Sequence, residues 1–131
     1  MAGATARTNH FVVRVERMAR AVQRLFASTE HEGRTLLRLT LDAGRGDRPA
    51  DQPVRGYRRV EWIERALEPL RETLSDEQFE RLVSALCLVV GWEAQIVLRD
   101  VRGLNPEVEE RVLTWAARTL VAGMVAEAER H

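Results

Sequence analysis

Hydrophobic residues recur along this chain at three- and four-residue spacing, the pattern of helices that bury one face. The first such segment spans residues 11–27, with arginines opposite an apolar side made of Phe11, Val15, Met18, Val22 and Leu25. A later one spans residues 57–74 and is interrupted by Pro69. Because proline removes a backbone donor and crowds the preceding turn, we expect a kink or an end near residues 66–68.

The short segment RTLLRLTLDA, residues 34–43, suits either a helix or a strand by its spacing of leucines. We favour a helix, because no second strand is present to satisfy the backbone groups of an isolated one. Ser28 or Thr29 is then the expected cap. The side chains expected to face the core are Leu36, Leu37, Leu39 and Leu41.

Residues 44–56 hold three of the eight glycines and two of the four prolines, a composition that predicts a flexible loop. Two long apolar segments close the chain and are separated only by residues 102–105. Ser75 and Gln78 form a capping box at the start of the first. Gly103 suits a left-handed turn, and Asn105 with Pro106 opens the last helix. The short connection predicts an antiparallel hairpin.

The two helices of this hairpin carry more apolar surface than one core face requires. Mostly small residues run beside the core face of each helix, and they are Ser84, Cys87, Gly91 and Gln95 on the first and Ala116, Thr119, Gly123 and Ala126 on the second. Such rows let another helix approach closely. We therefore expect two hairpins to form a four-helix interface between copies. The alternatives are a crossing within one copy and a hydrophobic face for a different protein.

Together these patterns predict an all-α fold, a five-helix bundle. A disordered tail is expected over residues 1–10, followed by a single domain over residues 11–131. The length of 131 residues suits one core. The chain has no net charge, which disfavours DNA as a partner. A lone cysteine and the lack of a signal peptide or a membrane-spanning segment predict a cytoplasmic protein without a membrane partner.

Candidate catalytic chemistry is sparse. His31 and Cys87 are the only pair that suggests a nucleophilic dyad, but Cys87 lies in an apolar run, where a thiol behaves as a small buried hydrophobe. No spacing of histidines and acids suggests a metal site, and no glycine-rich phosphate loop is present. We expect no enzyme, no metal and no cofactor.

Residues 11–130 resemble the C-terminal regulatory domain of the TetR family of transcriptional regulators. The resemblance depends on the order and spacing of ALEPLR, LVSALCLVVGWEA, VLRDVRGL and VLTWAARTLVAG. It implies an effector-binding and dimerisation domain whose last two helices pair with those of a second copy. Members of the family begin with a helix-turn-helix module of about fifty residues, whereas only a short polar segment precedes Phe11 here. Operator binding by this chain alone is therefore not expected.

In that architecture a pocket for a small amphiphilic or apolar effector lies between residues 36–41, residues 57–74 and the inner face of the helix after Ser75. The candidate ligand-binding residues are Arg38, Thr40, Trp62, Ala66, Leu86 and Val90. Ordinary core packing is the alternative for the apolar ones, and a solvated arginine for Arg38. The expected function is ligand sensing with homodimerisation. Its alternative is an interaction module, or a heterodimer partner of full-length regulators, that has no ligand.

Overall fold

The computed structural model describes residues 2–55 and 57–130, and the regular structure within them is entirely helical. Three residues lie outside the described ones: Met1, the first residue of the predicted tail, Gly56, the last of the predicted loop, and His131, the last of the predicted domain. The elements are α1 (Ala2–Ser28), α2 (Glu30–Ala43), α3 (Tyr57–Leu67), a 3-10 turn η1 (Glu68–Leu70), α4 (Asp76–Val89), α5 (Trp92–Ile96), a π-helical turn η2 (Val97–Val101) and α6 (Pro106–Glu129). The all-α prediction is confirmed.

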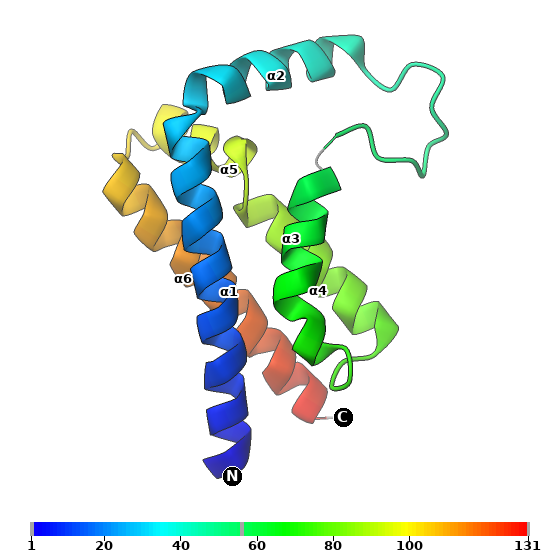
Figure 1. Cartoon of the computed structure of the whole chain (residues 1–131), viewed down its shortest axis with the longest axis vertical. Helices are drawn as coiled ribbons and strands as arrows, with labels where there is room; N and C mark the ends of the chain where they lie inside the picture. The colour runs from blue at the N-terminus through cyan, green and yellow to red at the C-terminus, as the bar shows by residue number, and fades with distance from the viewer. Residues whose placement is uncertain (1, 56, 131) are drawn as a thin grey trace.

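Four of these helices pack lengthwise around the core, and α2 lies across one end of them (Figure 1). The long helix α1 packs against α6 and α3, and α4 packs against both of these in turn. Fully buried residues come from all four, namely Val15, Ile63, Leu67, Leu86 and Val121. This core is the apolar face that the spacing of the sequence predicts.

Helix α1 begins at Ala2, so the prediction of a disordered tail over residues 1–10 is corrected for the described residues. Three alanines lie in this stretch, at positions 2, 4 and 6, and no proline interrupts it. Alanine has the highest helix propensity, so the polar start of the chain extends the amphipathic helix that follows it.

Helix α2 confirms the preference for a helix over a strand, but only one of its leucines lies in the core. Leu37 is buried, whereas Leu36, Leu39 and Leu41 are between 51% and 64% exposed. The prediction that all four face the core was wrong because α2 lies across the end of the bundle and packs on it mainly through α1 and α5. Thr29 occupies the cap position without a side-chain capping bond, since its hydroxyl donates to Leu25 O.

The predicted helix boundaries around Pro69, Ser75 and Pro106 are confirmed. Helix α3 ends at Leu67, and Pro69 lies in the η1 turn. Ser75 and Gln78 exchange both bonds of a capping box, and Asn105 Oδ1 accepts from Val108 N above Pro106 at the helix start. These termini are set by local hydrogen bonding, which explains why the sequence alone locates them.

The long helix expected after Ser75 is broken. Helix α4 ends at Val89, Gly91 adopts φ = 135°, and α5 with η2 continues at 43° to α4. Few residues other than glycine adopt that φ, so the prediction of one uninterrupted helix was wrong at Gly91. The break also replaces the expected five helices by six.

Within the subunit, α6 packs against α4 and runs in the opposite direction, as the predicted hairpin requires. The turn between them contains Gly103 at φ = 66°, and the ion pair between Arg81 and Glu127, at 3.5 Å, joins the start of α4 to the end of α6. By length and apolar content, no single helix of the described residues suffices to cross a membrane, and the bent pair of α4 with α5–η2 alone meets that criterion.

Candidate functional site

Two adjoining cavities lie beneath α2, where it crosses the end of the bundle. The first, called here the apolar chamber, has a volume of about 520 Å³. It lies between the end of α1, α2, the start of α3 and α5, and its lining residues are Leu25, Phe26, Thr29, Glu32, Leu36, Leu37, Thr40, Arg55, Arg58, Arg59, Trp62 and Trp92. The volume falls within the range of small-molecule sites.

An aromatic cluster forms one wall of the apolar chamber. The ring centroids of Phe26 and Trp92 are 4.7 Å apart, and those of Phe26 and Trp62 are 6.3 Å apart. Trp92 packs against the backbone of α2 at Gly33, where a Cβ atom would lie only 2.4 Å from the indole ring. The missing side chain of Gly33 thus allows Trp92 to occupy its place beside the chamber.

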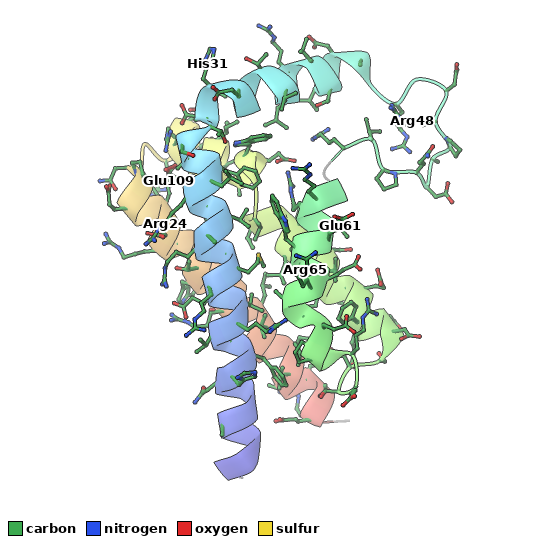
Figure 2. The ribbon with its side chains drawn as sticks, in the orientation of Figure 1. Arg24, His31, Arg48, Glu61, Arg65 and Glu109 are labelled. Atoms are coloured by element: carbon green, nitrogen blue, oxygen red, sulfur yellow. The ribbon has the colours of Figure 1, made fainter. Side chains whose placement is uncertain are left out.

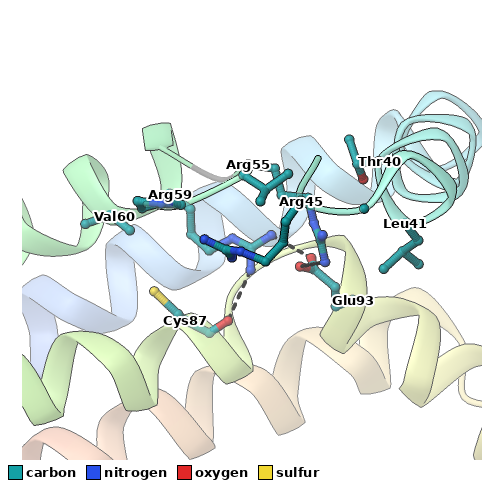
Figure 3. Close-up of a pocket in the computed structure, with 11 residues that line it drawn as sticks. Thr40, Leu41, Arg45, Arg55, Arg59, Val60, Cys87 and Glu93 are labelled. Carbon is teal, nitrogen blue, oxygen red and sulfur yellow. Dashed lines mark hydrogen bonds and ion pairs between the residues drawn. The ribbon is translucent and has the colours of Figure 1, made fainter. Parts of the chain in front are cut away.

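The second cavity, called here the outer cavity, has a volume of about 440 Å³ and opens toward the 44–56 loop (Figure 3). It shares Thr40, Arg55 and Arg59 with the apolar chamber. Its charged lining residues are Arg45, Arg55, Arg59 and Glu93. The cleft formed by the two cavities therefore combines apolar walls with a basic opening.

Arg59 is the central polar group of this cleft, and its side chain is only 14% exposed. Its Nη2 donates to Glu93 Oε1 at 2.5 Å, and its Nη1 donates to the backbone oxygen of Cys87 at 3.2 Å (Figure 3). Glu93 also pairs with Arg55, at 3.5 Å. Cys87 lies in the last turn of α4 and Glu93 in the first turn of α5, so Arg59 of α3 bridges both sides of the bend.

Two side chains beside Arg59 have shifted pKa values. Burial raises the pKa of Glu93, but the hydrogen bond from Arg59 and the charges of Arg59 and Arg55 outweigh this effect and hold it below its ordinary value. Glu93 is therefore ionised at neutral pH. Burial raises the pKa of the Cys87 thiol, and Glu93 adds to this shift against the opposing charge of Arg59. The Cys87 thiol therefore stays protonated at neutral pH.

His31, the predicted partner of Cys87 in a dyad, points away from the bundle, on the outer side of α2 (Figure 2).

Of the six predicted ligand-binding residues, two line the cleft and four do not. Thr40 lines both cavities and Trp62 lines the apolar chamber. Leu86, Val90 and Ala66 are buried core residues that line neither cavity. Arg38 is exposed on α2 and lies outside both linings.

Four lining residues were not predicted from the sequence, namely Phe26, Arg55, Arg59 and Trp92. Phe26 comes directly after Leu25, the last residue of the predicted apolar face of α1, and its ring packs against Trp92 of α5. Two signals were present, namely the arginines that follow the loop and the glycine inside the apolar run after Ser75. Neither reveals on its own that Gly91 bends the chain and brings Trp92 and Glu93 to the start of α3.

The residues of the two predicted interface rows differ in how exposed they are. Exposed members are Ser84, Thr119, Gly123 and Ala126, and the half-buried ones are Cys87 and Ala116. Gly91 and Gln95 are buried inside the subunit, so for these two the prediction of an interface position was wrong. Gly91 lies beneath Arg59, and the amide of Gln95 lies 3.2 Å from Phe26 O and 3.3 Å from Arg99 Nη2. The break after α4 turns both residues inward.

The exposed members lie beside large apolar side chains on what we call the α4–α6 face, made of Ser84, Leu88, Val112, Trp115, Thr119 and Gly123. Leu88 is 79% exposed and Trp115 is 57% exposed. Positions 112, 115, 119, 122, 123 and 126 of α6 recur at helical spacing without a charged residue among them. A Cβ atom added at Gly123 would meet nothing within 4 Å in this chain. The face is thus exposed, uncharged at these positions of α6, and open at Gly123.

A cluster of charges joins the helix after the bend to α6 and α2. Arg99 of η2 pairs with Glu30 of α2 and donates to Glu109 of α6 at 2.6 Å. Glu109 is fully buried and lies in the same part of the molecule as α5 and the end of α1 (Figure 2). Arg34 of α2 binds Asp100 through two bonds of 2.7 and 2.9 Å. Ionic contacts therefore join η2 to both α2 and α6.

The architecture thus supplies a cleft at a bend, an exposed apolar face, and ionic contacts that join η2 to α2 and α6. Each of these features comes from this chain's own residues. Comparison of the chain with models of protein families, with curated proteins and with solved structures finds no match.

Proposed function

We propose that this chain is the ligand-sensing and homodimerisation domain of a TetR-like transcriptional regulator. The observation that supports the proposal most directly is the α4–α6 face, which exposes Leu88 and Trp115 beside a stripe of small residues. A second copy is the partner because the hairpin that presents the face is the element that pairs in that family. DNA binding is not attributed to the described residues.

The energetics favour covering this face. Removing a leucine or a larger apolar side chain from water contributes about 1.5–3 kcal/mol. In a two-fold dimer each contact occurs twice, so Leu88 and Trp115 of both copies contribute together. The small side chains of Thr119 and Gly123 allow the two α6 helices to approach closely.

The cleft supplies the sensing part of the proposal. It lies at the bend between α4 and α5, and both arms of the bend belong to the hairpin that carries the α4–α6 face. A ligand that alters the bend changes the positions of α4 and α6 relative to each other. Occupancy of the cleft would then alter the geometry of the dimer.

Sedimentation equilibrium at micromolar concentration tests the dimer. We expect the wild-type chain to sediment as a dimer and Gly123→Arg to sediment as a monomer with unchanged helix content, because the arginine would place a charge in the middle of the face. The matched control is Glu61→Arg, which adds an arginine on the exposed side of α3 and should remain dimeric (Figure 2).

A wild-type monomer at these concentrations would overturn the homodimer. A monomer that pairs with a full-length regulator on co-expression would support the heterodimer alternative instead. Gly91→Arg is not a useful interface variant, because its side chain would collide with Arg59 inside the subunit.

A further inference from the structure

We infer that the cleft binds an amphiphilic anion, whose acidic head takes the place of the Glu93 carboxylate on Arg59 and whose apolar body lies against the aromatic wall. This inference rests on the proposed ligand-sensing function and assigns the chemical class of its ligand.

The apolar body is recognised by the aromatic wall of the apolar chamber. Phe26, Trp62 and Trp92 form this wall, and Leu36 and Leu37 line the chamber from α2. Leu36 lines the chamber and is 51% exposed, so apolar surface of its side chain remains for a ligand to cover. An alkyl or aryl group in the chamber would remove these surfaces from water.

The acidic head is recognised by an excess of arginines at the opening. Arg45, Arg55, Arg58 and Arg59 line the two cavities, against Glu93 and Glu32 as the acids. Arginine presents a planar fork of donors that binds a carboxylate or a phosphate through two bonds. The charge of the opening thus disfavours a cationic ligand and favours an anionic one.

Gly91 leaves the space that the side chain of Arg59 occupies. A Cβ atom at position 91 would lie 2.6 Å from the guanidinium carbon of Arg59, and the φ of 135° at Gly91 is one that other residues rarely adopt. The bend therefore serves to admit this guanidinium between α3 and α4. Two of its five N–H groups are used, by Cys87 O and Glu93, and its Nε has no partner among the described residues. Because this Nε is buried, the donor that a ligand head would take is the Nη2 group bound to Glu93.

Glu93 occupies the anion position when the cleft holds no ligand. Its carboxylate contacts both Arg59 and Arg55, and 38% of its side chain is exposed, so it can leave this position for solvent without unfolding the site. A ligand anion competes with Glu93 for the same donors. Because Glu93 belongs to α5 and Arg59 to α3, the exchange releases the tie between these helices and frees the bend.

Isothermal titration calorimetry with three ten-carbon probes tests the head-group preference, with the two ionic probes kept below their critical micelle concentrations and the alcohol below its solubility in water. The probes are decanoate, decan-1-ol and decyltrimethylammonium, which share an alkyl chain and differ in charge. We expect decanoate to bind at least about tenfold more tightly than decan-1-ol, the difference of one charged hydrogen-bonded contact, and the ammonium probe to bind most weakly.

Variants of Glu93 and Arg59 test which residues bind the acidic head of the probe. Glu93→Gln should strengthen decanoate binding several-fold and leave decan-1-ol unchanged, because it removes the competing carboxylate. Arg59→Met should abolish the preference for decanoate, with circular dichroism to show that the variant folds. The matched control is Arg102→Met, an exposed arginine outside both cavities, which should bind like the wild type.

In a Trp115→Phe background, decanoate should alter the fluorescence of Trp62 and Trp92, which locates the probe in the apolar chamber.

The outcomes separate this inference from the proposed function. Equal binding of all three probes, or unchanged decanoate binding in Glu93→Gln, would overturn the anion inference and leave the cleft as a ligand site. Failure of every probe to bind would overturn ligand sensing in this cleft as well. The oligomeric state, measured on the same samples by sedimentation, is an independent result.

Discussion

At the scale of single residues, glycines and arginines decide the local structure of the site. Gly33 makes room for Trp92, and Gly91 makes room for Arg59. Each glycine is needed because of one large neighbour from another helix. The importance of these positions therefore depends on contacts that are remote in the sequence.

We predict that Gly91→Ala lowers the free energy of unfolding by about 2–4 kcal/mol, because alanine adds both strain at φ = 135° and a clash with Arg59. Chemical denaturation followed by circular dichroism measures this. The matched control is Gly103→Ala, since Gly103 has a φ of 66° but open space around its Cβ position. It should lose only about 1 kcal/mol. Equal losses in the two variants would show that Arg59 does not lie over Gly91.

At the scale of elements, the segment after the bend is held by its charges. η2 has no buried residue of its own, yet it carries Arg99 and Asp100, which contact Glu30, Glu109 and Arg34. The position of η2 thus depends on ion pairs more than on apolar packing, which is typical of a segment of low local stability.

We predict that Arg99→Met lowers the free energy of unfolding by about 3 kcal/mol, because it leaves the buried carboxylate of Glu109 unpaired. The double variant Arg99→Met with Glu109→Leu should recover most of this loss, since an apolar pair of similar volume replaces the charges. Urea denaturation of the four members of the cycle gives the coupling energy. Arg81→Met is the control, because Arg81 is 51% exposed and its surface ion pairs contribute less than about 1 kcal/mol. Additive losses in the cycle would contradict the prediction.

At the scale of the whole molecule, the bundle has two features that a closed single-subunit core would lack. Helix α2 covers one end of the bundle incompletely and leaves the cleft beneath it, and the hairpin exposes the α4–α6 face. In the function proposed above, the first feature would admit a small ligand and the second would admit a second copy. Both leave apolar surface exposed that the helices of one chain do not cover.

We predict that the midpoint of thermal unfolding rises with protein concentration, because dissociation of a homodimer accompanies unfolding and mass action stabilises the assembled state. Differential scanning calorimetry over a hundredfold range of concentration measures the shift. Gly123→Arg, which carries a charge on the α4–α6 face, should unfold at a midpoint independent of concentration. A wild-type midpoint that is equally independent of concentration would contradict dimerisation.

Local signals made much of the architecture predictable. The capping box at Ser75, the Asn105–Pro106 start and the end of α3 before Pro69 follow from hydrogen bonds and sterics within a few residues. The candidate site was less predictable, since only Thr40 and Trp62 of the proposed ligand residues line the cleft. Arg59 and Trp92 reach it from helices whose relative placement depends on a bend at Gly91.

The sequence by itself determined that the chain is helical, which faces of its main helices are apolar, and where most of them begin and end. Helical periodicity and end capping are properties of neighbouring residues, so they are legible without a fold. Only the tertiary structure decided that Gly91 and Gln95 turn inward, that α2 leaves three leucines exposed, and that Arg59 meets Glu93 across the bend. These outcomes depend on the angles at which helices cross, and those angles are set by contacts between residues far apart in the chain.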